Sequence, residues 1–171
     1  TVRLDPALAT SARGVIFVSA NAVAFGLPIL RNAGLGLDSA CFAVGDATAN
    51  ALRLAGQTRV HVPEGGFDSE HLLALPALQQ VKGDVLLIVK GSGASDGRTL
   101  IAETLAARGA TIEVLNCYER RAAEVNDSLR VQVIELLGKA EAAVFVVASV
   151  ESLDALEASF AGFVVRLRSA M

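Results

Sequence analysis

The sequence predicts an α/β protein built on a doubly wound parallel sheet, and three observations lead to this fold class. Short apolar runs rich in β-branched residues alternate with segments of helical length and helical apolar spacing over residues 14–115. Small or polar residues that can cap a helix follow the apolar runs. Of the 171 residues, 53% are hydrophobic, which is enough to bury a sizeable core. This alternation is typical of βαβ units with right-handed crossovers, in a flavodoxin-like domain with helices on both faces.

The expected elements follow one another in a regular order. Strands are predicted at 14–18, 40–44, 59–62, 84–89 and 111–115, and helices at about 20–31, 46–56, 69–80 and 97–108. The uncharged run at 14–30 approaches the length of about 18 residues at which a membrane helix becomes plausible. Its β-rich start, its Ser-Ala-Asn break and its Gly-Leu-Pro end instead favour a buried strand followed by a buried helix.

The same pattern restarts after Ala122, which suggests a second lobe. Helices are predicted at 127–138 and 149–159, with a strand at 142–147 and a possible strand at 163–167. These few elements cannot cover a sheet on both faces, so the second lobe is expected to be incomplete. The predicted organisation is a linker strand at 1–6, a complete α/β lobe at 7–115, a return linker at 116–121 and a partial second α/β lobe at 122–171.

Charge and cysteine usage exclude several classes of function. The formal net charge of −3 does not favour a nucleic-acid or anionic-membrane surface. Cys41 and Cys117 end apolar runs and form no CxxC motif, and the two histidines are isolated. We therefore expect reduced, buried thiols of a cytoplasmic protein and no metal site. No Ser-His-Asp set or pair of catalytic carboxylates is visible.

Four predicted helix starts should lie at one edge of the sheet, after Ser19, Gly45, Ser69 and Gly91. Helix N-termini favour negative charge, so together they could hold an anion, with Lys90 and Arg98 at the rims. Simple capping explains Ser19, Asp46 and Ser69 equally well. The loop 91–97 matches neither a dinucleotide fingerprint nor a Walker motif, so it is either a plain turn or an anion cradle. If the backbone at the helix start after Gly45 approaches a ligand closely, Thr48→Phe should weaken ligand binding more than it weakens stability.

The stretch LNCYERRA at 115–122 concentrates polar residues between the two expected lobes and contains the only tyrosine, Tyr118. We expect it to pair with residues 2–4, and strand alternation should then turn Cys117 and Glu119 away from Tyr118 and Arg120. Tyr118 either packs its ring between lobes or assists a leaving group in a cleft between them.

Several segments, in order and spacing, resemble the uroporphyrinogen-III synthase family. They are IFVSANAV (16–23), AVGDATANALRLAG (43–56), DSEHLLALP (68–76), VLLIVKG (85–91), GRTLIAETLAARGATIEVLNCYERR (97–121) and VVASVESLDAL (146–156). The resemblance implies two α/β lobes joined by a two-stranded linker, with the active site between them. Relative to that pattern the chain lacks the N-terminal and much of the C-terminal part of one lobe, and residues 94–96 look like an insertion.

The resemblance also implies an activity. It is the cyclisation of hydroxymethylbilane to uroporphyrinogen III, with inversion of the last pyrrole ring and loss of water, by a cytoplasmic, monomeric lyase without metal or organic cofactor. From the residues themselves we expect Tyr118 to be the catalytic residue. The helix starts, the glycine loop and nearby cations give the expected substrate-binding residues Ser19, Asn21, Ala22, Gly45, Ala47, Thr48, Ser69, Lys90, Gly91, Ser92, Arg98 and Arg120. Helices that cradle anions also suit a non-catalytic two-lobe module that binds an anionic small molecule, and this alternative stays open.

Overall fold

The computed structural model describes residues 6–92, 99–119, 126–139, 146 and 150–159. The chain divides into two compact units, Thr1–Arg120 and Arg121–Met171, and each is considered by itself. The expectations for residues 1–5, including their pairing with 115–122, lie outside the described residues. The predicted lobe boundaries therefore stay a prediction.

The first unit is built on a five-stranded, all-parallel sheet. Its strands are β1 (Gly14–Phe17), β2 (Cys41–Ala43), β3 (Val60–His61), β4 (Val85–Ser92) and β5 (Thr111–Glu119). All four pairings are parallel, and the strand order is β3-β2-β1-β4-β5. The predicted parallel α/β class is confirmed. The direction of winding reverses between β1 and β4, whereas the flavodoxin order is 2-1-3-4-5.

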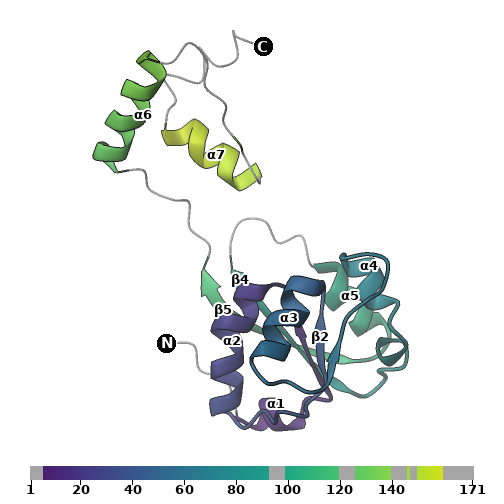
Figure 1. The fold of residues 1–171 in the computed structure, drawn as a ribbon. Helices are drawn as coiled ribbons and strands as arrows, with labels where there is room; N and C mark the ends of the chain where they lie inside the picture. The colour runs from purple at the N-terminus through teal and green to yellow at the C-terminus, as the bar shows by residue number, and fades with distance from the viewer. Residues whose placement is uncertain (1–5, 93–98, 120–125, 140–145, 147–149, 160–171) are drawn as a thin grey trace. The chain divides into compact units, whose positions relative to one another are not determined.

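Helices cover both faces of this sheet, as the predicted crossovers require (Figure 1). Helix α2 (Ala20–Asn32) and helix α3 (Asp46–Leu54) contact each other and cover one face. Helices α4 (Ser69–Leu73) and α5 (Thr99–Ala107) contact each other, and α5 packs on β5. A short α1 (Pro6–Ser11) precedes β1. The helix expected at 69–80 is shorter, because Pro76 follows α4 and begins the separate 3₁₀ turn η1 (Pro76–Leu78).

The core lies between the sheet and its helices. All four residues of β1 are buried, as are the three of β2 and the segment 86–89 of β4. Strands buried on both faces read as continuous apolar runs, which explains why residues 14–30 looked membrane-like in sequence. Among the described residues, no helix is long and apolar enough to cross a membrane.

The second unit contains two described helices, α6 (Asp127–Lys139) and α7 (Val150–Ser159). Both agree with the predicted helices to within one residue. Asn126 caps α6, because its side-chain oxygen accepts a hydrogen bond from the backbone N–H of Leu129. The strands expected at 142–147 and 163–167 fall outside the described residues, apart from the exposed Val146.

Strand β5 is longer than expected and takes in part of the predicted return linker. It continues to Glu119, and β4 continues alongside it to Ser92. The pairing is regular as far as Lys90 with Asn116, and the next pair is Gly91 with Tyr118. Cys117 is therefore an extra residue in β5, and the ladder contains a β-bulge at this point.

Candidate functional site

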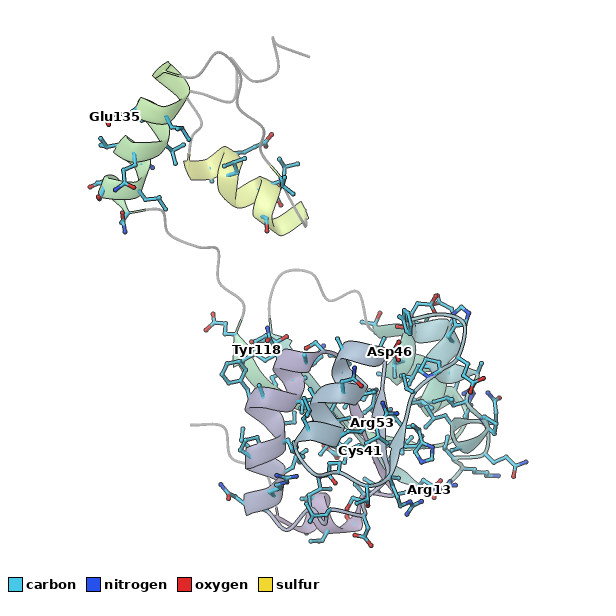
Figure 2. The ribbon with its side chains drawn as sticks, in the orientation of Figure 1. Arg13, Cys41, Asp46, Arg53, Tyr118 and Glu135 are labelled. Carbon is cyan, nitrogen blue, oxygen red and sulfur yellow. The ribbon has the colours of Figure 1, made fainter. Side chains whose placement is uncertain are left out.

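The carboxyl ends of the parallel strands form one edge of the sheet, where open α/β sheets bind their ligands. Helices α2 and α3 begin directly after β1 and β2, so their N-termini lie at this edge. In Figure 2 the labelled Tyr118 and Asp46 lie at the same end of the unit, and Arg13, just before β1, lies at the opposite end. The sheet edge therefore brings the β5 tyrosine to the same side as two helix N-termini.

Ser19 begins α2 and contacts Tyr118 directly. It has an extended backbone, and its Oγ accepts a hydrogen bond from the backbone N–H of Ala22 at 3.1 Å. The same Oγ lies 3.3 Å from the Tyr118 hydroxyl, and either oxygen can be the donor. The phenol is thus linked to a capping hydroxyl at the positive end of a 13-residue helix.

The bulge at Cys117 decides where the Tyr118 side chain points. Cys117 Sγ lies 3.8 Å from the Ala22 carbonyl oxygen and 3.4 Å from that of Lys90, while the Tyr118 ring reaches Ser19 and Phe25. Neighbouring residues therefore both contact α2 or its cap. The expectation that Cys117 points away from Tyr118 is wrong, because the extra residue interrupts the alternation of the strand.

Three further contacts surround the half-buried Tyr118. A Cβ on Gly91 would lie 2.4 Å from two atoms of the Tyr118 ring, so the ring rests directly on the glycine backbone. The Phe25 ring centroid lies 5.6 Å from that of Tyr118, with the planes tilted by 41°. The Ser92 hydroxyl donates to the Tyr118 backbone carbonyl at 3.4 Å. Of the proposed binding residues, Ser19, Gly91 and Ser92 are therefore gathered around Tyr118.

The remaining proposed residues of α2 and α3 differ in how exposed their side chains are. Asn21 and Ala47 are exposed near their helix N-termini and are open to a ligand. Ala22 is fully buried and Thr48 is 5% exposed, so neither side chain lies on the surface. The burial of Thr48 does not support the expectation for Thr48→Phe, since a larger ring at a packed position should reduce stability first.

The α3 and α4 starts differ from expectation in detail. Gly45 provides no side-chain cap for α3. A Cβ at Gly45 would lie 3.2 Å from Cβ of Phe67, so Phe67 lies beside the α3 N-terminus. The side chain of Phe67 is 62% exposed. The cap of α4 is Asp68 and not Ser69, because Asp68 Oδ1 accepts from the His71 backbone N–H at 2.8 Å. The hydrogen bonds that Asp68 makes with His71, first with its backbone N–H and then with its ring, hold the pKa of Asp68 below its usual value.

The cationic residues proposed for anion binding are only partly described. Lys90 is half-buried and lines a small cavity between β4, β5 and α5, with Thr99 and Glu103, on the opposite face of the sheet from α2. Arg98 and Arg120 lie outside the described residues. A role for these three side chains stays a prediction.

The two thiols are free and poorly ionised. Burial raises the pKa of the Cys41 thiol to about 11, against a smaller lowering by Arg31. Burial also raises the pKa of Cys117. No group of three or more His, Cys, Asp or Glu side chains suited to a metal ion occurs in the described parts of the chain.

Sequence reasoning did not identify Phe25, Asp68 or the bulge. Phe25 lies in an apolar run and looked like a core residue, but it is 54% exposed. The sequence places Asp68, another residue type that can cap a helix, one position before Ser69. The sequence signal for the bulge is weak, since Cys117 reads as an ordinary strand residue.

Comparison with known proteins bears directly on this arrangement. The family model for uroporphyrinogen-III synthase HemD matches residues 2–162, which is nearly the whole chain. The chain belongs to the uroporphyrinogen-III synthase family. The resemblance recognised in the sequence is thereby confirmed.

Similar members of the family come from enteric bacteria. The uroporphyrinogen-III synthase of Salmonella typhimurium (strain LT2) is 40% identical over 108 residues, which is 62% of this chain and 43% of that protein. The enzyme of Escherichia coli (strain K12) is 43% identical over 79 residues, or 46% of this chain and 31% of that protein. The chain thus spans less than half the length of these relatives.

A solved structure of the family shares the fold. Wild-type uroporphyrinogen III synthase from the extremely thermophilic bacterium Thermus thermophilus aligns with a TM-score of 0.50 and 28% identity, covering 66% of this chain and 43% of that one. A mutant of the same enzyme gives a TM-score of 0.50 at 27% identity. The doubly wound α/β class of the first unit is therefore shared with a synthase of known structure.

Proposed function

We propose that the protein carrying this chain is a uroporphyrinogen-III synthase, a lyase that cyclises hydroxymethylbilane with inversion of the last pyrrole ring and loss of water. Membership of the family supports the reaction. The observation that carries the assignment of the site is the contact between the Tyr118 hydroxyl and the Ser19 cap of α2. It lies at the sheet edge where this class of fold binds ligands.

Tyr118 is the proposed proton donor to the leaving hydroxyl group. The Ala22 N–H donates to Ser19 Oγ, so the Ser19 hydroxyl hydrogen is available to the Tyr118 oxygen. In that arrangement the Tyr118 hydrogen is directed elsewhere and can pass to the hydroxymethyl oxygen of the substrate. The oxygen leaves as water, and the pyrrole nitrogen lone pair forms the azafulvene cation. The phenolate left behind is stabilised by the Ser19 hydroxyl and by the positive end of α2.

The substrate-binding part of the proposal rests on the helix N-termini. Hydroxymethylbilane is a polycarboxylate, and the exposed starts of α2 and α3, near Asn21 and Ala47, offer positive helix ends at one sheet edge. We propose that Lys90, Arg98 and Arg120 add cationic contacts. Such contacts mainly hold one conformer of a flexible substrate, and this positioning favours closure of the ring.

The proposal includes no organic cofactor or metal, because the reaction is a dehydration and ring closure with no change of oxidation state. We also propose that the protein is a cytoplasmic monomer. The free thiols of Cys41 and Cys117 suit a reducing compartment.

An isomer assay tests the proposed function. The full-length protein is incubated with hydroxymethylbilane, the products are oxidised, and porphyrin isomers I and III are separated. The unassisted reaction gives isomer I, so a synthase should give mostly isomer III. Tight binding of hydroxymethylbilane without enrichment of isomer III would instead indicate the non-catalytic binding module.

A further inference from the structure

Phe25 is an exposed aromatic residue on α2, whose other large apolar side chains, those of valine, leucine and isoleucine, are buried or half-buried. Its neighbours Val23, Gly26 and Leu27 on α2 are buried, whereas 54% of Phe25 is exposed. Exposure of a large apolar side chain is common when it occurs singly and needs no explanation by itself. The position of the Phe25 ring against Tyr118 is what distinguishes it.

The other contacts that Tyr118 makes with described residues leave its ring room to move. The separation of 3.3 Å between the two hydroxyl oxygens is long, since hydrogen bonds between hydroxyl groups are usually about 2.7–2.8 Å. Gly91 has no side chain, so it gives the ring a surface to rest on but no lateral wall. The strand that carries Tyr118 is also at the edge of the sheet. Phe25 supplies the aromatic contact, at 5.6 Å and 41°, within the range of favourable tilted pairs.

The geometry points to Phe25 as a positioning residue, which holds the Tyr118 ring so that its hydroxyl stays at the α2 N-terminus. The effect of Phe25 on catalysis rests on the proposed function, whereas its effect on the position of the Tyr118 ring does not depend on that function. Phe25 acts through the ring of Tyr118 and transfers no proton itself. Its loss should therefore lower kcat and leave KM nearly unchanged.

The kinetic test compares Phe25→Ala with Phe25→Leu and with a control, Leu54→Ala. Leu54 is 90% exposed and is the last residue of α3. The control therefore removes an exposed apolar side chain at the end of the helix opposite to its N-terminus. We expect Phe25→Ala to lower kcat by about 2- to 12-fold, the size of an aromatic pair contact. Phe25→Leu, which keeps apolar bulk, should recover part of the loss, and Leu54→Ala should have no effect.

A double-mutant cycle separates positioning from substrate contact. Each Phe25 variant is repeated in a Tyr118→Phe background, where no phenol proton is left to place. The loss of kcat caused by Phe25→Ala should disappear there. An equal loss in both backgrounds, or a raised KM with unchanged kcat, overturns the inference, because Phe25 would then act on the substrate or on the fold.

An optical measurement keeps the inference testable if the proposed function fails. Tyr118 is the only tyrosine of the chain, which has no tryptophan. The near-ultraviolet circular dichroism of Tyr118 is obtained by subtracting the spectrum of the Tyr118→Phe protein measured in the same background. This band should weaken in Phe25→Ala and not in Leu54→Ala, since a mobile ring has little optical activity. If wild type makes no isomer III, the proposed function is wrong, and an unchanged band would then show that Phe25 does not fix the ring.

Discussion

The hydroxyl groups of Ser19 and Tyr118 lie 3.3 Å apart, although 99 positions separate the two residues in the chain. The strand order creates this contact. Strand β4 pairs with β1 on one side and with β5 on the other, so the loop after β1 and the end of β5 reach the same sheet edge. The bulge in β5 then turns the ring toward the helix that Ser19 caps.

Removing only the phenol oxygen tests the proposed role of Tyr118. Tyr118→Phe keeps the ring on Gly91 and against Phe25, so thermal unfolding should change little. The rate of isomer III formation should fall by about 10²–10⁴-fold, the usual contribution of general acid catalysis. A variant that retains nearly full turnover would show that the phenol serves only in packing.

Ser19→Ala should affect both stability and rate. It removes the α2 cap, which typically costs about 1 kcal/mol of the free energy of unfolding, and it removes the hydroxyl next to Tyr118. Asp68→Ala removes a comparable cap from α4 and serves as the control for stability. We expect denaturant unfolding to show similar losses for the two variants, and isomer III formation to slow markedly only for Ser19→Ala.

Two glycine substitutions should have opposite signatures. In Gly91→Ala the new Cβ would lie 2.4 Å from the half-buried Tyr118 ring, which can move aside, so activity should fall more than stability. In Gly26→Ala the Cβ would lie 2.3 Å from Cγ1 of the buried Val89. Overpacking of this kind costs about 1–3 kcal/mol, and the higher helix propensity of alanine returns about 1 kcal/mol. Gly26→Ala should therefore lower stability more than activity. Melting temperatures and isomer III rates measured on both variants check this contrast.

The cysteines should react slowly with thiol reagents in the native protein. With a pKa of about 11, Cys41 has about one thiolate in a thousand molecules at pH 8, and its side chain is fully buried. Cys117 is half-buried, its pKa is also raised, and it should react faster than Cys41 but more slowly than a free thiol. Rates with a chromogenic disulfide reagent, before and after unfolding in urea, measure this. Rapid native reaction of Cys41 would contradict its burial.

The α4 cap should weaken in acid. The pKa of Asp68 is lowered in the folded state, chiefly by the hydrogen bond from the His71 backbone N–H. Its stabilising contribution is therefore complete above the ordinary aspartate pKa of about 3.9 and is lost as the pH falls through the lower folded-state pKa. The stability difference between wild type and Asp68→Asn should shrink over that window, as followed by urea unfolding at each pH. A difference independent of pH would show that the charge is irrelevant.

Much of the fold could be predicted because local signals and the tertiary structure agree. Buried parallel strands such as 14–17 and 86–89 are continuous apolar runs, and Ser19 and Asp68 provide caps of the expected chemistry. Helix boundaries in α2, α6 and α7 came within one residue. The strand order was less accessible, since it depends on which crossover reverses direction and leaves no local pattern.

The site was only partly predictable. Ser19, Gly91 and Tyr118 share a sheet edge, which follows from parallel strands. Ala22 and Thr48 were placed on the site because they follow helix starts, but helical rotation turns both side chains into the core. The direction of Tyr118 relative to Cys117 depended on the bulge, a property of two paired strands that neither strand reveals alone.

The bulge in β5 determines which face of the sheet Tyr118 points to. Deleting Cys117 would let Tyr118 take the next place in the ladder after Asn116, in unbroken alternation. Asn116 pairs with Lys90, which faces α5, so the phenol would then stay on the face that α2 covers. If Cys117 instead took the regular place opposite Gly91, Tyr118 would point to the face that α5 covers, away from Ser19. The extra residue thus lets two successive side chains, Cys117 and Tyr118, reach the same side of the sheet.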